Sequence, residues 1–313
     1  MKNVVVIGGG HGQSVILRGL KNIADIHVSA VVTVADDGGS TGRLRNGYNM
    51  PAMGDIRNVM VSLAESETMM SELMDYRFGG HVDVSGHSLG NLMLTALTQI
   101  SGNFLEAIKT LSKVLKVKGE VIPSTTQIVD LIAVMEDGTK VKGESNIPKF
   151  HNRIEKVYYE NKVFATEEAI RAIHDADYIL FGIGSLYTSI MPNVIIEEIA
   201  YALKKSHAKK IYFCNAMSQP GETDNYTLED HVEAIEKHTY PGIIDLVVYH
   251  SNVLHDEVLK YYKEEGSYPV AIKEEEHDYK IVKKDLLKFE NNLIRHESGK
   301  IKKAFEEILE EEF

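Results

Sequence analysis

The chain opens with short apolar runs that alternate with stretches in which apolar residues recur every three or four positions. The runs Asn3–Ile7 and His27–Val34 have the length of buried strands. The recurrence over Ser14–Leu20, and again from Ile56, is typical of helices that bury one face. Strands that alternate with helices in this way indicate an α/β protein whose parallel strands are joined by crossover helices.

The pattern is different in the middle of the chain. Helical stripes at 89–100 and 104–115 give way to period-two runs around 121–125, 128–135 and 154–159. Glu136–Thr139 has the composition of a hairpin turn between two of these runs. We therefore expect a small antiparallel insert at about residues 117–163.

The strand and helix alternation resumes after the insert. Strands are predicted at Tyr178–Gly182, Lys210–Asn215 and Ile243–Tyr249, and a helix at Asn193–Lys204. The whole pattern predicts one domain, 1–313, with a Rossmann-like, doubly wound and mostly parallel sheet. A charged strand and helix segment, about 262–313, follows; its terminal helix, which includes Glu306–Glu312, is amphipathic and is expected to pack on the body or on a partner.

Charge and cysteine content narrow the possible functions. The formal net charge of −12 disfavours general binding to nucleic acid or to anionic membrane. One cysteine, Cys214, rules out an intrachain disulfide and favours the reducing cytoplasm, and no apolar run approaches the roughly 18 residues of a membrane span. Neither H-x-x-x-H nor C-x-x-C spacing occurs, so a zinc site is not expected.

Two glycine-rich segments, Gly8–Gly12 and Asp36–Arg43, follow the first two predicted strands. Small residues let backbone N–H groups approach a diphosphate, and a helix start favours anions. Gln13 stands where the dinucleotide fingerprint has glycine or alanine, which disfavours an ordinary NAD enzyme but leaves an NAD-type dinucleotide as an alternative ligand. Asp36 and Asp37 are candidates for Mg²⁺ coordination or for contact with a ligand hydroxyl.

Two further segments open predicted helices. In Gly54–Asn58, Asp55 suits a helix cap, whereas Arg57 has the wrong sign for the helix dipole unless an anion lies nearby. Gly86–Gly90 matches the G-x-S-x-G elbow of serine hydrolases, which are the alternative here. An elbow needs a buried strand before it, and residues 79–85 are polar. We interpret the segment as a helix start that presents His87, Ser88 and Asn91 to a ligand.

Polar loops also follow the later strands, at 182–189 and 215–223. Each alone could be a turn that caps local backbone. Loops that share one edge of a sheet instead indicate a ligand pocket, where amides and hydroxyls recognise base, ribose or sugar. The candidate ligand-binding residues are Gly9, Gly10, His11, Gly12, Asp36, Asp37, Gly38, Gly39, Ser40, Thr41, Arg43, Asp55, Arg57, Asn58, His87, Ser88, Asn91, Gly184, Ser185, Tyr187, Thr188, Asn193, Asn215 and Gln219.

Taken together, these motifs resemble the YvcK-type gluconeogenesis factors of the CofD-like family. The segments that carry the resemblance are Gly8–Gly12, Ala35–Arg45, Pro51–Asn58, Gly86–Asn91, Gly182–Asn193 and Cys214–Asn225. The resemblance implies a Rossmann-like core, UDP-sugar binding and a role in cell shape during gluconeogenic growth. It places phosphate contacts at Gly10, His11, Gly12, Ser40, Thr41 and Arg43.

The same resemblance leaves two classes of function. CofD transferases move a phospholactyl group to a deazaflavin with Mg²⁺ and release GMP, and Asp37 matches their acceptor-binding acidic residue. The segment after Asp37 is richer in glycine than in those enzymes, which favours a UDP-sugar-binding regulatory protein with a protein partner and possible self-association. The alternative is a Mg²⁺-dependent transferase of a phospholactyl-type group from a nucleotide diphosphate donor, with Asp37 as its catalytic residue.

Overall fold

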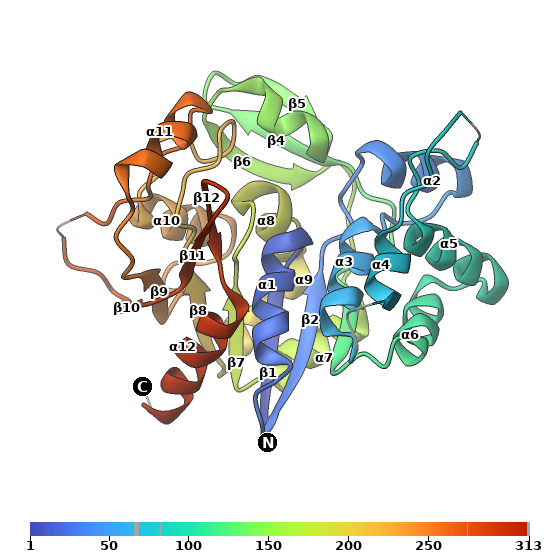
Figure 1. Cartoon of the computed structure of the whole chain (residues 1–313), viewed down its shortest axis with the longest axis horizontal. Coiled ribbons are helices and arrows are strands. Elements are labelled where there is room, and N and C mark those ends of the chain that lie inside the picture. Colours follow the sequence, from blue (N-terminus) through green and yellow to red (C-terminus); the bar gives the residue numbers. More distant parts are fainter. Residues whose placement is uncertain (66–68, 82, 274, 312–313) are drawn as a thin grey trace.

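A parallel sheet forms the centre of the computed structural model (Figure 1). The structure describes residues 1–65, 69–81, 83–273 and 275–311. Within these residues the sheet has seven strands in the order β10-β9-β8-β7-β1-β2-β3. Neighbouring strands are parallel throughout. The bounds are β1 Lys2–Gly8, β2 Ile26–Val32, β3 Glu120–Pro123, β7 Tyr178–Phe181, β8 Lys209–Phe213, β9 Leu246–His250 and β10 Lys280–Lys284. The winding direction reverses between β1 and β7, and ligand crevices of α/β sheets form beyond the strand ends at such a point.

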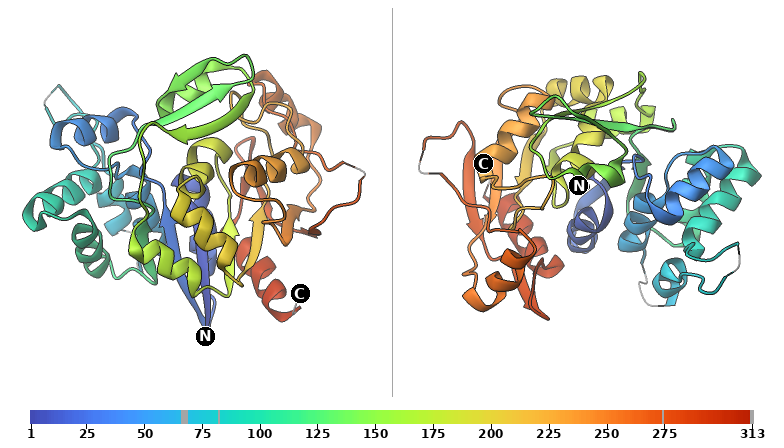
Figure 2. Two further views of the ribbon diagram at one scale, coloured as in Figure 1. Left: turned by 180° about the vertical axis from the view of Figure 1, so that it is seen from behind. Right: turned by 90° about the horizontal axis from the view of Figure 1, so that it is seen from above.

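Helices cover both faces of this sheet, which is why its central strands are apolar on both sides. One face carries α1 (Gly10–Leu20), α3 (Gly54–Leu63) and α12 (Ser298–Glu310), and the other carries α7 (Glu167–His174) and α9 (Glu197–Lys205) (Figures 1 and 2). In β1, Val4–Ile7 are at most 1% exposed. The α/β class and the doubly wound sheet predicted from the sequence are confirmed.

A group of helices lies beside the β3 edge of the sheet (Figure 1). It consists of α2 (Gly39–Tyr48), α4 (Met69–Asp75), α5 (Leu89–Ser101) and α6 (Phe104–Val114). The glycine-rich segment Asp36–Arg43, for which the sequence predicts no helix, contains the start of α2. Glycines weaken an isolated helix, but Leu44 and Arg45 are buried by the surrounding fold, and tertiary packing overrides local propensity.

The predicted small antiparallel sheet is present, and it begins later than expected. Its strands β4 (Leu131–Met135), β5 (Lys140–Lys142) and β6 (Ile154–Tyr159) pair antiparallel in the order β5-β4-β6. The run at 121–125 belongs instead to β3, parallel to β2 in the main sheet. A period of two describes strands of either kind, so the sequence pattern alone does not assign this run to a sheet.

The antiparallel sheet lies above the carboxyl ends of the parallel strands (Figure 1). The 3₁₀ segment η1 (Glu144–Phe150) joins β5 to β6 and contacts the loop after β8. At Gly221, with φ +81°, an added Cβ would lie 1.8 Å from the Pro148 carbonyl oxygen. Glycine is therefore required where the two segments meet, and the insert forms a roof over the strand ends.

The predicted helix Asn193–Lys204 is interrupted. A π-helical turn (Leu186–Ile190) and a short helix α8 (Met191–Val194) precede α9. Two further helices, α10 (Leu228–His238) and α11 (Asp256–Glu264), follow β8 and β9. None of the described helices is long and apolar enough to cross a membrane.

The C-terminal segment packs on the body of the protein. After β10, the hairpin of β11 (Leu287–Glu290) and β12 (Leu293–His296) leads into α12, which buries Ile301, Phe305 and Ile308. Helix α12 lies along α1, where an added Cβ on Gly19 would come 2.5 Å from the Ser298 carbonyl oxygen. Glu312, which the predicted terminal helix includes, lies outside the described residues.

Candidate functional site

The first turn of α1 is built from glycine. Gly10 has φ +60°, a conformation that suits glycine, and the predicted glycine loop therefore forms the start of the helix itself. An added Cβ on Gly12 would lie 2.1 Å from the Ile183 carbonyl oxygen, so glycine lets α1 begin against the loop after β7. Gly9, the N-cap residue, has no side chain to cap this helix, and the Asp55 carboxylate accepts a hydrogen bond from the Gly10 N–H. The following N–H groups of the first turn have no partner within the helix and are the donors that face an anionic ligand.

A cavity of about 920 Å³ lies next to this turn, beyond the ends of β1, β7 and β8. Its volume is in the range of small-molecule sites. Four residues predicted from the sequence line it: His11, Gly12, Asn215 and Gln219. Sequence reasoning missed the rest of its polar wall, notably Arg18, Tyr262, Lys288 and Arg295.

The outer wall of this cavity comes from the C-terminal segment. The Tyr262 hydroxyl accepts a hydrogen bond from the Ile294 N–H (2.8 Å) and lies 3.2 Å from the Ile294 carbonyl oxygen. These contacts fix β12 against α11, so Arg295 is positioned by a strand that pairs with β11. The sequence of this region shows charge but no glycine cluster or carboxylate doublet, which is why it carried no signal of a site.

The loops after β7 and β8 hold each other at the cavity. The Asn215 amide donates to the Gly184 carbonyl (2.9 Å), and the Gly184 N–H donates back to the Asn215 Oδ1 (3.3 Å). The Ser185 hydroxyl donates to the Gln219 Oε1 (2.8 Å). These contacts orient the two amide side chains that line the cavity.

Three other predicted residues of these loops are buried in the scaffold. The Tyr187 hydroxyl lies 2.8 Å from that of Tyr226, and the Thr188 hydroxyl donates to Glu222 Oε1 (2.9 Å). The Asn193 amide donates to the Gly8 carbonyl (3.0 Å) and so holds the end of β1. The structure thus gives Tyr187, Thr188 and Asn193 positioning contacts within the protein, away from the cavity lining.

Carboxylates gather on the other side of the glycine turn. An added Cβ on Gly9 would lie 2.5 Å from Asp55 Oδ2, and one on Gly54 would lie 2.9 Å from Asp36 Oδ2. Met53, not Asp55, occupies the cap position of α3, and Asp55 turns toward the start of α1. Asp37 accepts a hydrogen bond from the Ser145 N–H of the insert (2.9 Å).

Burial and mutual repulsion raise the pKa values in this cluster. Burial, and then repulsion from Asp36, raises the pKa of Asp55 to about 7. Burial together with Asp36 and Asp55 raises the pKa of Glu144 to about 8. Burial raises the pKa of Glu222 to about 7, although the Thr188 hydroxyl and the Tyr187 N–H donate to it. Burial and nearby negative charge disfavour the ionised form, so these carboxyl groups lose their protons at a higher pH than exposed carboxyl groups do.

The residues at the starts of α2 and α5 bind one another. The Gly38 N–H donates to Asp36 Oδ1 (2.8 Å), and Gly39 begins α2 with φ +45°. The Thr41 hydroxyl of α2 packs against the start of α3, since an added Cβ on Gly54 would lie 2.7 Å from Thr41 Oγ1. Ser40 Oγ lies 2.7 Å from His87 Nδ1, and the Arg43 guanidinium donates to the Ser85 carbonyl (2.6 Å). The two helix starts are therefore joined through side chains.

Ser88 is a helix cap. Its hydroxyl accepts from the Asn91 N–H (3.3 Å), and α5 begins at the next residue, which confirms the predicted helix start. The described residues of 79–86 are bends and turns with no strand among them, and His87 bonds Ser40 in place of Ser88. Among the described residues, the segment therefore lacks the buried strand that a hydrolase elbow requires.

The Arg57 side chain is held by the protein itself. Its guanidinium donates to Asn58 Oδ1 (2.6 Å) and lies 3.5 Å from Asp75, and burial lowers its pKa. The sequence predicted a ligand anion beside Arg57. The carboxylate of Asp75 offsets part of the wrong sign for the helix dipole. Arg57 Nε and Nη1 are buried without a hydrogen-bond partner among the described residues, so the ligand anion stays a prediction.

A family model described as 2-phospho-L-lactate transferase CofD matches residues 4–287. This chain belongs to the CofD family. The gluconeogenesis factor of Bacillus subtilis is 43% identical over 312 residues, 98% of each chain, and that of Listeria monocytogenes is 42% identical over 310 residues, 96% of this chain and 94% of the other. The resemblance predicted from the motifs is confirmed.

A solved structure has the same fold as this chain. The crystal structure of a UPF0052-family protein from Bacillus halodurans is similar to this CofD-family chain with a TM-score of 0.92 and 43% identity, covering 97% of this chain and 99% of that one. Four of the segments that carry the resemblance, Gly8–Gly12, Ala35–Arg45, Gly182–Asn193 and Cys214–Asn225, follow strands β1, β2, β7 and β8, whereas Pro51–Asn58 and Gly86–Asn91 open helices α3 and α5. Two carboxyl groups of the cluster were missed: Glu222 lies inside the predicted polar loop 215–223 but was not among its candidate residues, and Glu144 comes from the insert, which has no glycine cluster.

Proposed function

We propose that this CofD-family protein is a regulatory protein that binds a UDP-sugar, with the diphosphate against the first turn of α1 and the rest of the ligand in the 920 Å³ cavity. The observation that carries the proposal is the position of this cavity. It opens at the point where the sheet reverses direction and is lined by His11 and Gly12 of the first turn of α1.

Local charge supports an anionic ligand even though the whole chain has a net charge of −12. Arg18, Lys288 and Arg295 line the cavity together with two carboxyl groups, Glu265 and Glu297, and His11 lies in the glycine turn, so cationic side chains outnumber anionic ones there. Guanidinium groups recognise phosphate oxygens through paired N–H donors. The Asn215 and Gln219 amides line the same cavity, after the end of β8, and suit the hydroxyls of a sugar or the edge of a base.

The experiment is a thermal-shift series with UDP-N-acetylglucosamine, UDP-glucose, NAD and GDP. Ligand at 100 times its Kd stabilises a protein by about 2.7 kcal/mol. We expect a UDP-sugar to raise the unfolding temperature most. A larger shift with NAD would favour a dinucleotide, and no shift with any nucleotide would contradict the proposal.

Arg295→Gln tests the place of the ligand. This change removes the charge of one cavity side chain, and we expect about ten-fold weaker UDP-sugar binding with an unchanged unfolding temperature of the free protein. Arg171→Gln, on α7 at the opposite face of the sheet, is the matched control and should bind as the unaltered chain does. Equal affinity of both variants would place the ligand elsewhere.

The cellular part of the proposal takes its direction from the relatives named gluconeogenesis factors. The liganded protein would support cell shape and growth on gluconeogenic carbon from the cytoplasm, through a protein partner. Complementation of a strain that lacks the factor tests this. The unaltered chain should restore growth on a gluconeogenic carbon source, whereas Arg295→Gln should restore it poorly.

The carboxylate cluster favours a second candidate, a Mg²⁺-dependent transferase of a phospholactyl-type group. Carboxylate oxygens are the ligands that Mg²⁺ prefers, and the cluster of Asp36, Asp55 and Glu144 fits such a donor set. Bound there, Mg²⁺ would neutralise phosphate charge on a nucleotide diphosphate donor. Asp37, beside the insert, would contact the acceptor.

Asp37→Asn separates the two candidates. The asparagine oxygen keeps the acceptor position for the Ser145 N–H, so the fold should be retained. A transferase would lose turnover of its nucleotide donor in the presence of Mg²⁺. A binding protein would show no turnover in either form, and its UDP-sugar affinity, measured by calorimetry with and without Mg²⁺, would be unchanged.

A further inference from the structure

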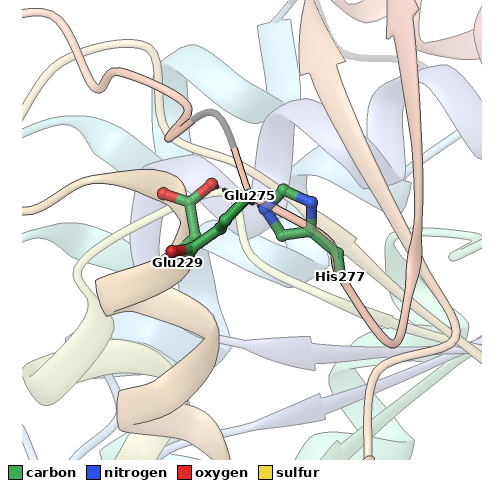
Figure 3. Close-up of side chains that lie close together, drawn as sticks. All are labelled: Glu229, Glu275 and His277. Atoms are coloured by element: carbon green, nitrogen blue, oxygen red, sulfur yellow. Dashed lines mark hydrogen bonds and ion pairs between the residues drawn. The ribbon is translucent and has the colours of Figure 1, made fainter.

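A cluster of three metal-ligating side chains lies outside the site described above. Among the described residues, Glu229, Glu275 and His277 place one potential ligand atom each within 4.8 Å of one another. Figure 3 shows them converging from two elements: Glu229 from the first turn of α10, and the other two from the loop before β10. The sequence analysis expects no zinc site, because Glu229 is far along the chain from Glu275 and His277 and the three residues form no recognisable ligand spacing.

The buried Glu229 carboxylate has one oxygen that lacks a hydrogen-bond partner in the part of the chain that the structure describes, which indicates that this oxygen binds a ligand. Glu229 is 8% exposed. Its Oε1 accepts from the Lys273 N–H (3.0 Å) and lies 2.9 Å from His277 Nε2. Its Oε2 is also buried, yet it has no hydrogen-bond partner among the described residues. A buried carboxylate oxygen without a donor is unfavourable, and a cation would satisfy it.

We propose that Glu229, Glu275 and His277 bind a divalent transition-metal ion of the Zn²⁺ type. An imidazole nitrogen with two carboxylate oxygens suits Zn²⁺, whereas Mg²⁺ and Ca²⁺ prefer oxygen ligands alone. Ligand atoms about 2.0–2.2 Å from a shared ion in tetrahedral coordination lie about 3.4 Å apart, so closure from separations of up to 4.8 Å needs a shift of up to about 1.4 Å. Glu275 is exposed and free to make this shift, and water would complete the coordination.

The ion would act as a clamp between α10 and the edge of the sheet. The loop before β10 already touches α10 through the Leu228 N–H, which donates to the Ala271 carbonyl (2.8 Å), and through Lys273. The cluster adds a third connection directly before β10 begins. Because β10 leads into the β11–β12 hairpin, metal binding would stabilise the segment that ends in the wall of the large cavity.

The test is calorimetric titration of the untagged, chelator-treated protein with Zn²⁺ in buffer that contains Mg²⁺. We expect one Zn²⁺ per chain and, with Co²⁺ as the probe, visible absorption bands of four-coordinate geometry. Glu275→Gln and His277→Gln should each weaken Zn²⁺ binding at least about ten-fold. Glu276→Gln, the adjacent exposed carboxyl group, is the matched control and should bind Zn²⁺ normally.

Two further results decide the proposal. Asp36→Asn should keep the affinity for Zn²⁺, because the carboxylate cluster beside α1 is a different site; loss of Zn²⁺ binding in this variant would overturn the assignment. Unchanged Zn²⁺ binding in Glu275→Gln would do the same. This variant replaces an exposed side chain, so its folding, checked by circular dichroism, is not at risk. Failure of the unaltered chain to bind Zn²⁺ would also refute the clamp.

Discussion

At the scale of single residues, carboxyl groups dominate the electrostatics of the candidate site. Asp55, Glu144 and Glu222 come from three segments that are far apart in the sequence, and each has a raised pKa because it is withdrawn from water near other acids. Glycines at 9 and 54 allow this approach, since a Cβ at either position would collide with a carboxylate. The cluster stores electrostatic repulsion that a cation or protons relieve.

This repulsion predicts the pH dependence of stability. The folded chain keeps the Glu144 proton up to a pKa of about 8, whereas the unfolded chain releases it near the ordinary value of 4.5. Because the folded state binds more protons between these values, the free energy of unfolding should fall as pH rises from about 4.5 to about 8. Urea unfolding in the presence of a chelator, at several pH values, measures this slope.

Glu144→Gln should flatten the slope and stabilise the protein by about 1 kcal/mol at the upper end of the window. Replacement of the exposed Glu233 on α10 by Gln is the control and should leave the slope as it is. A wild-type stability that rises across this pH range would show that the cluster is not strained.

Ser88 supports a second prediction at this scale. Ser88→Ala removes the cap of α5 and should lower the free energy of unfolding by about 1 kcal/mol, as loss of a helix cap usually does. Urea unfolding measures the loss. A fluorophosphonate probe should leave the unaltered chain unlabelled, and stoichiometric labelling of Ser88 would instead identify a serine hydrolase.

At the scale of elements, close packing of helices on one another sets the position of the site. Helix α1 begins against the loop after β7 at Gly12 and lies along α12 at Gly19. Interiors are packed at crystal-like density, so an added methyl group at either contact forces a shift of backbone. The C-terminal segment is thereby tied to the same helix whose start faces the cavity.

Gly19→Ala should separate α12 from α1. The new Cβ would meet the Ser298 carbonyl oxygen at 2.5 Å, and we expect a loss of about 1–3 kcal/mol of stability. Gly47→Ala on α2 is the control, because its Cβ would enter open space and alanine favours a helix. Chemical unfolding of both variants gives the comparison; similar stabilities would mean that the α1–α12 contact is loose.

At the scale of the whole molecule, residues from both ends of the chain form one cavity. The glycine turn lies at positions 9–12, and the facing hairpin β11–β12 lies at 287–296. A ligand that bridges them would order the hairpin against the body. The insert covers the carboxyl ends of the parallel strands, so ligand entry is expected from the side of the hairpin (Figure 1).

Hydrogen exchange measures this ordering. Addition of a UDP-sugar should slow amide exchange in β11–β12 and at the start of α1, because opening of these segments would require release of the ligand. Helices α5 and α6, at the far edge of the sheet, serve as the internal control and should exchange at the same rate with and without ligand. Protection confined to α2 and α5 would place the ligand on the carboxylate side of the glycine turn.

The sequence predicted those parts of the fold that are specified by residues close together in the chain. Apolar runs specified β1, β2 and β7 because buried parallel strands are continuous in hydrophobicity. Glycine motifs located the start of α1 and the loops at the strand ends. Helix α2 was missed because its stability comes from burial of Leu44 and Arg45, and β3 was assigned to the insert because a period of two does not reveal the partner strand.

By itself, the sequence determined the α/β class, the family and the sheet edge at which the polar loops gather, since each depends on residues close together in the chain. The tertiary structure alone decided which of these residues share a space. It placed Asn215 and Gln219 in a cavity with Arg295, buried Tyr187 and Asn193, and brought Glu144 from the insert beside Asp36 and Asp55. The physical reason is that burial and the mutual repulsion of charges act through space, where neighbours come from segments that the sequence pattern does not connect.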